Sequence, residues 1–418
     1  MPAAIPQHTV LIVGAGAAGI AVAASLLARD RTLDIALVDP ADVHYYQPGW
    51  TMVGGGIFKA PSTARTMAST LPAGVCWIKA AVRSFEPHAQ RVTLTDGREI
   101  GYRQLIVCPG LKLDWQAIEG LEETLGCNGV TSNYRYDLAP YTWELVQNLR
   151  EGRALFTQPP MPIKCAGAPQ KAMYLSCDHW LRRQRIGPIR AQFFNAGAVL
   201  FGVADYVPAL MEYVDRYGIE LNYSHRLVAV DGPKRRATFI RTLADGTTET
   251  VVQPFDMLHV VPPQVAPEVI RNSLLADPAG WLDVDPATLR HRTFANVHGL
   301  GDVINTSNAK TAAAARKQAP VVANNVLVNL GRLPTLMAYD GYGSCPLTVA
   351  RGKIVLAEFT YGGKLAPSFP RWLLDGRKAT RLAWWLKARV LPPLYWRGML
   401  KGREWLAKPT AMTGEAHS

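Results

Sequence analysis

A glycine-rich turn between an apolar strand and an alanine-rich helix constrains this chain more than any other feature. Residues 9–13 read as a strand, and a helix is predicted to extend to about Arg29. The glycines of the turn are Gly14, Gly16 and Gly19. The next predicted strand ends at Asp39, where a carboxylate would accept hydrogen bonds from an adenosine ribose. This pattern predicts a dinucleotide site, without distinguishing FAD from NAD. The alternative is a turn that only packs helix against strand.

A second signal, far along the chain, favours FAD. Residues 295–302 read as a strand that ends in Gly301-Asp302, and a helix is predicted to begin near Lys310. Asp302 is expected to accept a hydrogen bond from a ribityl hydroxyl, and the helix N-terminus to face the electron-rich edge of a reduced flavin. NAD needs no distant Gly-Asp of this kind. We therefore assign Gly301, Asp302 and Lys310 to FAD binding together with Gly14, Gly16, Gly19 and Asp39.

The middle of the chain predicts a second α/β unit without a nucleotide fingerprint. A strand over 189–194 leads into residues 195–202, where GxGxxG spacing is missing and Leu200 and Phe201 are bulky. Electrons are therefore not expected from NADH or NADPH. The predicted fold class is α/β, with two Rossmann-like dinucleotide-binding domains and a C-terminal amphipathic membrane-docking segment. The FAD-binding domain is placed at 1–132 and 288–340, the second domain at 133–287, and the C-terminal segment at 341–418.

One cysteine lies where its neighbours would make it reactive. Prolines hold residues 159–162 extended, and Pro169 suits the first turn of a helix predicted from about 170 to 183. Cys165 thus precedes a helix N-terminus, and Lys164 and Lys171 would further favour its thiolate. The small residues at 166–168 would let a flat ring lie beside the sulfur. The alternative is a buried structural cysteine.

The composition of the chain limits which cellular compartment and which partners are expected. Six cysteines in 418 residues are too few for a disulfide framework, and no secretory leader precedes the first strand, so a reducing compartment is predicted. In such a compartment a disulfide between distant cysteines is more often catalytic than structural. No apolar run is long enough to span a membrane. No metal site and no nucleic-acid partner are predicted, and nothing specifies an oligomeric state.

The C-terminal segment is basic and rich in tryptophan. From residue 364 onward, eleven Lys and Arg face three Asp and Glu, which gives +8 of the total +12. We expect tryptophans and cations of this segment to meet lipid headgroups. They are Trp372, Trp384, Trp385, Trp396 and Trp405, with Arg377, Lys378, Arg381, Lys387 and Arg389. Leu382, Trp385, Leu386 and Val390 share a predicted helical face, and Pro392-Pro393 is expected to separate this helix from a second one. The alternative is a lid packed on the core.

These features together resemble sulfide:quinone oxidoreductases, within the two-dinucleotide-binding-domain flavoproteins, and most of all their type II branch. The resemblance extends from Gly14 to about Trp405. Its most specific motifs are His44-Tyr-Tyr-Gln-Pro, Ile163-Lys-Cys-Ala-Gly-Ala-Pro-Gln-Lys171, Met257-Leu-His-Val, Gly301-Asp302, Lys310-Thr-Ala-Ala-Ala and Tyr339-Asp-Gly-Tyr-Gly-Ser-Cys-Pro-Leu347.

The resemblance implies a redox pair at Cys165 and Cys345, which hydrosulfide would attack as a disulfide or trisulfide. It further implies electron transfer to FAD and a membrane quinone, release of sulfane sulfur to a small acceptor, and peripheral attachment to a bacterial cytoplasmic membrane. Phe359 matches the aromatic that stacks on the quinone, although a core role on a strand is equally open. Cys127 lies near a third cysteine of some bacterial branches, but its surroundings do not match.

Other functions remain open at this point. They are an NADH:quinone reductase, a sulfide dehydrogenase that passes electrons to a cytochrome, and a flavin-binding sulfide sensor without turnover. The missing fingerprint near Asn195 argues against the first, and the missing export signal argues against a periplasmic cytochrome partner.

Overall fold

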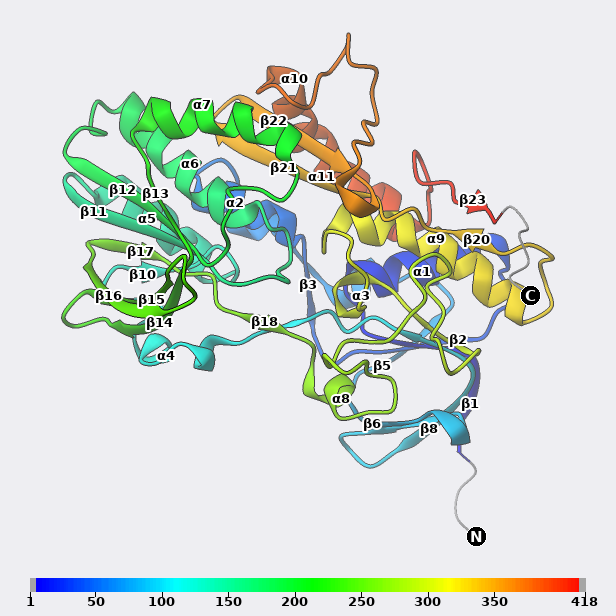
Figure 1. The fold of residues 1–418 in the computed structure, drawn as a ribbon. Helices are drawn as coiled ribbons and strands as arrows, with labels where there is room; N and C mark the ends of the chain where they lie inside the picture. The colour runs from blue at the N-terminus through cyan, green and yellow to red at the C-terminus, as the bar shows by residue number, and fades with distance from the viewer. Residues whose placement is uncertain (1–4, 413–418) are drawn as a thin grey trace.

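The computed structural model describes residues 5–412, and its first sheet carries the glycine-rich turn (Figure 1). This sheet has seven strands, in the order β5-β2-β1-β8-β7-β6 with β19 paired to β8. Strand β1 lies between β2 and β8, both parallel to it, and Val10, Leu11 and Ile12 are fully buried. The bounds are β1 (Gln7–Val13), β2 (Ile35–Val38), β5 (Val75–Ile78), β6 (Val82–Glu86), β7 (Arg91–Leu94), β8 (Glu99–Val107) and β19 (Val297–Gly299). Such a continuous apolar run is expected of a central parallel strand covered on both faces.

Two helices pack side by side against this sheet. They are α1 (Ala17–Arg29), which follows the glycine-rich turn, and α9 (Ala312–Asn329), which follows β19. Figure 1 shows them as the blue and yellow helices on the same side of the first unit. Together with the pairing of β19 with β8, this packing brings Gly301 to the start of α1 at Ala17, although the two positions are 284 residues apart in sequence (301 − 17).

The second unit is a five-stranded parallel sheet, in the order β10-β17-β11-β12-β13. Its strands are β10 (Val130–Thr131), β11 (Gly152–Gln158), β12 (Ile189–Asn195), β13 (Glu220–Tyr223) and β17 (Met257–His259). Its main helices are α5 (Leu138–Asn148), α6 (Ala168–Arg182) and α7 (Val207–Tyr217). An antiparallel sheet of β14 (His225–Asp231), β15 (Arg236–Thr242) and β16 (Thr248–Pro254) joins it. The predicted α/β fold is confirmed.

The boundaries between the two units differ from the predicted residues 133 and 287. Strand β10 pairs with β17 of the second sheet, so the second unit begins before residue 130. Ile270, Leu282 and Leu289 are fully buried in the core of the first unit, so the return to that unit occurs soon after β18 (Gln264–Val265). Both passages of the chain between the two units run through short strands and irregular segments. Such segments show no hydrophobic periodicity, so the sequence did not indicate where the passages lie.

A hairpin and a helical segment complete the chain. Strands β21 (Gly343–Ala350) and β22 (Lys353–Phe359) pair antiparallel, and β21 packs on α6. The segment 381–401 is helical throughout: α10 (Arg381–Trp385) and α11 (Leu391–Pro393) alternate with wider turns over Leu386–Val390 and Leu394–Gly398. The predicted separation at Pro392-Pro393 is wrong, since the wide turns accommodate two residues without N–H donors. Within residues 5–412, no helix is both long enough and apolar enough to cross a bilayer.

Candidate active site

The glycine-rich turn has the shape that a dinucleotide requires. Gly14 has a φ of +105°, and a side chain there would lie 2.6 Å from the carbonyl oxygen of Cys108. A side chain at Gly19 would overlap the carbonyl of Gly14, whereas one at Gly16 would meet nothing within 4 Å. Gly14 and Gly19 are therefore needed for packing, and open space remains at Gly16. Helix α1 begins there with no side-chain cap and no acidic residue in its first turn, so its N–H groups are free for an anion.

Asp39 lies at the end of β2, as predicted, and is tied to the same turn. Its carboxylate accepts hydrogen bonds from the backbone N–H groups of Ala15 at 2.6 Å and Ala41 at 2.8 Å, one on each oxygen. Each carboxylate oxygen has two acceptor sites, so capacity for ribose hydroxyls remains.

The Gly301-Asp302 turn lies against the first turn of α1. Gly301 has a φ of +81°, and a side chain there would lie 3.1 Å from the Cβ of Ala18. The Asp302 carboxylate is half-buried and accepts no hydrogen bond from any residue between 5 and 412. Burial raises its pKa, while the ammonium groups of Lys164 and Lys310 oppose that shift. A carboxylate without a protein donor at this place suits a hydroxylated ligand.

Lys310 serves this turn through the backbone. Its ammonium donates to the carbonyl oxygens of Asp302 at 2.8 Å and Ile304 at 2.7 Å, and lies 4.3 Å from the centre of the Trp281 ring. Lys310 therefore holds the turn in place, and its charge is occupied by protein carbonyls.

Two cysteines from distant parts of the chain meet beside this turn. The sulfur atoms of Cys165, before α6, and Cys345, on β21, are 3.8 Å apart. The backbone N–H of Cys165 donates to the carbonyl of Lys310 at 2.8 Å, and its φ of +48° lies in the left-handed region. Glycine at 167 permits the approach, because a side chain there would lie 2.6 Å from the Cys345 sulfur.

A buried lysine polarises this pair. The ammonium of Lys171, one turn into α6, donates to the Cys165 sulfur at 3.1 Å, and Lys171 is 2% exposed. The hydrogen bond from the Cys345 thiol, together with Lys171 and Lys387, holds the pKa of Cys165 well below its ordinary value, although burial opposes this. The same hydrogen bond and burial raise the pKa of Cys345. The arrangement favours a thiolate at Cys165 and a thiol at Cys345, which suits thiol–disulfide exchange.

Comparison with known proteins places this site in a family. Residues 8–146 match the family described as pyridine nucleotide-disulphide oxidoreductase. The chain is 42% identical over 405 residues to the mitochondrial sulfide:quinone oxidoreductase of Dictyostelium discoideum, covering 96% of this chain and 87% of that protein. The chain belongs to the sulfide:quinone oxidoreductase family. The mouse mitochondrial protein of the same name is 38% identical, with 95% of this chain and 87% of its own length covered.

Solved structures show how widely the fold is shared. The sulfide:quinone oxidoreductase of Aquifex aeolicus superposes with a TM-score of 0.79 at 19% identity, over 96% of this chain and 92% of that one. NDH2 of Plasmodium falciparum, solved in complex with NADH, superposes with a TM-score of 0.63 at 12% identity, over 94% and 99%. The fold alone therefore does not decide the electron donor, and the residues at the sites must.

In this member of the sulfide:quinone oxidoreductase family, apolar side chains close the end of β12. Leu200 and Phe201 are both buried there, and Gln170 donates from its side chain to the Leu200 carbonyl. Asn195 holds the loop at its start, donating to the carbonyl of Val199 at 2.8 Å and accepting from the N–H of Gly197 at 2.8 Å. This edge of a doubly wound sheet is where a nucleotide would otherwise bind. The loop fills it.

Phe359 is the last residue of β22 and is half-buried. Its ring packs edge-to-face against that of Phe201, with the ring centres 6.1 Å apart. Phe359 therefore makes a core contact while part of its surface is exposed.

The other four cysteines lie away from the pair. Cys108 and Cys177 are buried, and burial raises the pKa of both thiols. Cys76 and Cys127 are exposed, and the Cys127 sulfur contacts the carbonyl of Thr124 at 3.3 Å.

Two residues of the site were missed in the sequence. Lys387, expected to reach lipid headgroups, is 3% exposed and donates to the carbonyl of Pro48 at 2.9 Å. Burial and the nearby Lys171 lower its pKa to about 8. Tyr134 donates from its hydroxyl to the Lys164 carbonyl at 3.0 Å and so supports the loop before Cys165. Lys387 lies four residues after Ala383, which is also buried, so the two share the inward face of the helix. The sequence carried only this four-residue spacing as a signal.

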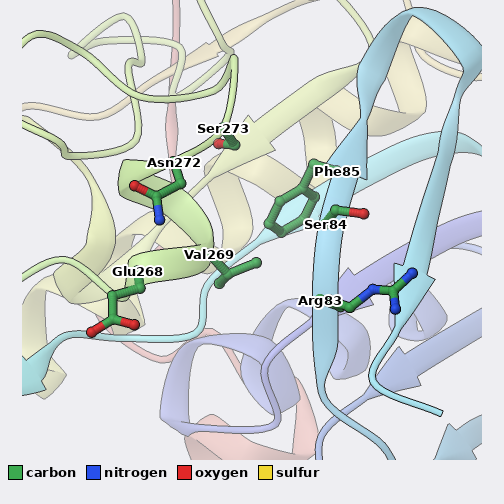
Figure 2. A pocket seen from close by; sticks show the side chains of 7 residues that line it. All are labelled: Arg83, Ser84, Phe85, Glu268, Val269, Asn272 and Ser273. Atoms are coloured by element: carbon green, nitrogen blue, oxygen red, sulfur yellow. The ribbon is translucent and has the colours of Figure 1, made fainter. Parts of the chain in front are cut away.

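A surface pocket of about 330 Å³ lies apart from this chemistry. Figure 2 shows it between strand β6 and helix α8 (Glu268–Arg271), lined by Arg83, Ser84, Phe85, Glu268, Val269, Asn272 and Ser273. Its lining contains no cysteine and no residue of the glycine-rich turn.

Proposed function

We propose that this chain oxidises sulfide through Cys165 and Cys345, using FAD, and passes the electrons to a membrane quinone. One observation carries the proposal: the two sulfurs are 3.8 Å apart, and Lys171 lies 3.1 Å from one of them. Sulfide at neutral pH is partly the hydrosulfide anion, and buried ammonium groups would draw that anion to the pair. Family membership supports the same reaction.

FAD is the proposed cofactor, held without a covalent bond. The pyrophosphate would lie at the open space beside Gly16, with the N–H groups of α1 as donors. Asp39 would accept from the adenosine ribose and Asp302 from a hydroxyl of the ribityl chain. The N-terminus of α9, capped by the Thr311 hydroxyl, is placed to favour negative charge on the ring. When bound, FAD accepts an electron pair from a thiolate and gives it to a quinone.

The sulfur exchange follows from the asymmetry of the pair. Hydrosulfide attacks the Cys345 sulfur of an oxidised Cys165–Cys345 pair, forms a new S–S bond there, and breaks the existing one. Cys345 becomes a persulfide, and Cys165 leaves as the thiolate, because the Lys171 ammonium 3.1 Å from its sulfur stabilises the negative charge that forms there. The electron pair taken from sulfide now resides on Cys165. A small nucleophile accepts the outer sulfur from Cys345 as sulfane sulfur and leaves Cys345 reduced. The Cys165–Cys345 bond forms again when the two cysteines give up an electron pair, which bound FAD would accept.

Phe359 is the proposed contact for the quinone ring. It lies at the end of β22, the partner strand of β21, and residues 345 and 357 face each other across that hairpin. The alternating side chains of β22 put residues 357 and 359 on one face. Phe359 therefore lies on the face that carries Cys345.

Peripheral membrane docking is proposed for one face of the C-terminal segment. Trp372 is 85% exposed, and Leu373, Leu382, Trp385 and Trp405 are exposed as well, beside the exposed cations Arg371, Arg381 and Arg389. Trp396 does not belong to this face, because it is buried in the core of the first unit, and Leu386 packs on Leu374 and Ala383. A bacterial cytoplasmic membrane remains the predicted location. The relatives from Dictyostelium discoideum and mouse are mitochondrial proteins.

Anaerobic titration with sulfide tests the proposal. Sulfide should bleach the flavin absorbance of the purified protein, and addition of a short-tailed quinone should restore it, cycle after cycle. A sensor would bind sulfide without steady-state quinone reduction, and a cytochrome-linked enzyme would reduce a cytochrome instead of quinone. Absence of bleaching in protein that contains flavin would contradict the proposed reaction.

A further inference from the structure

We propose that the C-terminal helical segment is part of the dinucleotide site, because Tyr395 holds His44 against the glycine-rich turn; this role rests on the dinucleotide binding proposed above. The Tyr395 hydroxyl lies 2.6 Å from His44 Nε2, and His44 Nδ1 lies 3.2 Å from the carbonyl oxygen of Ala15. Ala15 stands between Gly14 and Gly16, where the backbone must face the pyrophosphate. Tyr395, which lies 351 residues after His44 in sequence, is thus linked to the glycine-rich turn through the His44 imidazole.

The hydrogen atoms in the two contacts that join Tyr395, His44 and Ala15 have one consistent assignment. A carbonyl oxygen only accepts, so His44 Nδ1 must carry the proton that it donates to Ala15. In a neutral ring Nε2 then has a lone pair, and the Tyr395 hydroxyl donates to it. His44 is 3% exposed, and burial lowers its pKa, which keeps the ring neutral. Tyr395 is 5% exposed, so water does not compete for either contact.

Aromatic packing fixes both side chains. The ring centre of Tyr395 lies 4.8 Å from that of Tyr46 and 5.1 Å from that of Trp396, and Trp396 lies edge-on to His44 at 5.7 Å. The Arg65 guanidinium lies 4.2 Å above the Trp396 ring. His44 and Tyr46 of the motif His44-Tyr-Tyr therefore supply the surface on which Tyr395 and Trp396 pack, a role that the proposed chemistry does not use.

The same segment also fixes the far end of α1. Glu404 accepts from the Ser25 hydroxyl at 2.7 Å and from the Arg29 guanidinium at 3.0 Å. Gly402, with a φ of +69°, passes close enough that a side chain there would lie 2.6 Å from the Ala24 carbonyl. Helix α1 is thus held near its N-terminus through His44 and near its C-terminus through Glu404. Its direction determines where its free N–H groups point.

Tyr395→Phe tests this role, because it removes the hydroxyl and keeps the ring. Flavin-free protein is titrated with FAD, and quenching of flavin fluorescence gives Kd. Loss of one buried hydrogen bond predicts a rise in Kd of about fivefold. Tyr174→Phe is the matched control, since Tyr174 is fully buried in the second unit and donates to the Leu210 carbonyl at 3.2 Å. That control should lower thermal stability similarly and leave Kd unchanged.

A double-mutant cycle separates a positioning role from general stability. His44→Asn keeps an N–H group where Nδ1 stands and removes the acceptor for Tyr395. Adding Tyr395→Phe to it should then change Kd less than twofold. Full multiplication of the two effects, or an unchanged Kd in Tyr395→Phe, would overturn the proposal.

The proposed proton positions can also be tested on the wild-type protein, so the test does not depend on whether a variant folds. Nitrogen-15 spectra of the histidine rings should show His44 protonated at Nδ1, and protonation at Nε2 alone would refute the path. Wild-type protein that fails to bind FAD would instead overturn the proposed function.

Discussion

Replacing Lys171 by methionine should remove most of the thiolate at Cys165. The change keeps the length of the side chain and deletes an ammonium that lies 3.1 Å from the sulfur and is 2% exposed. Removing one partner of a buried charge pair costs about 3–5 kcal/mol. The hydrogen bond from Cys345 and the charge of Lys387 remain, so the lower end applies. About 3 kcal/mol corresponds to roughly a hundredfold loss of thiolate at a pH below the new pKa.

Alkylation of reduced protein by iodoacetamide measures this thiolate without need of the cofactor. A lowered pKa means that the Cys165 rate reaches its plateau at low pH. In Lys171→Met the rise should move to higher pH, and below neutral pH the rate should fall about a hundredfold. Peptide mass spectrometry separates Cys165 from the exposed Cys127, which serves as the internal control. Lys234→Met, at an exposed position, controls for loss of a charge. Superimposable pH profiles for wild type and Lys171→Met would refute the assignment.

Three further predictions follow from the site and the surface. Cys165→Ala and Cys345→Ala should each abolish sulfide oxidation in a quinone-reduction assay while FAD stays bound, and Cys127→Ala should keep substantial activity; turnover near wild type in either of the first two would exclude the redox pair. NADH and NADPH should leave the flavin absorbance unchanged, because Leu200 and Phe201 fill the end of β12; rapid bleaching would show that the loop opens. Leu382→Glu combined with Trp385→Glu should lower sedimentation with anionic liposomes at least about tenfold, since each residue loses about 1.5–3 kcal/mol of apolar burial. Val252→Glu, on the exposed strand β16, is its control, and unchanged sedimentation of the double variant would exclude this face.

The parts predicted well from sequence were those specified by local rules. Gly14, Gly16 and Gly19 indicated a strand, a turn and a helix by their spacing, and the close approach of Gly19 to the carbonyl of Gly14, five residues earlier, is a local steric demand of this kind. The helix after Cys165 was predicted from Pro169 and begins at Ala168. Lys171 is one turn into that helix, so its approach to Cys165 also follows from local geometry. The pairing with Cys345 does not: 180 residues separate the two sulfurs, and only the resemblance to a known family connected them.

The C-terminal segment shows why an amphipathic pattern alone is insufficient. An apolar stripe indicates only that one face of a helix is excluded from water, and either a protein core or a bilayer can exclude it. Here the segment meets both: Leu382 and Trp385 face outward, whereas Tyr395, Trp396, Met399 and Leu400 complete the core of the first unit. Lys387 is of a residue type that often contacts lipid headgroups. It is nevertheless buried near the cysteines, because it lies on the inward face of its helix.

This arrangement determines which experiments on the segment are interpretable. Deleting it would remove membrane contacts, the Lys387 charge and the support of His44 together, and would expose the core that Trp396 fills. Loss of activity in such a truncation would therefore say nothing about membrane binding. Single substitutions separate the roles, because Trp385, Lys387 and Tyr395 lie on different faces of one continuous helical path. If docking, thiolate formation and FAD affinity respond independently to those three substitutions, the segment acts through three local contacts. If one substitution alters all three, the segment moves as a unit.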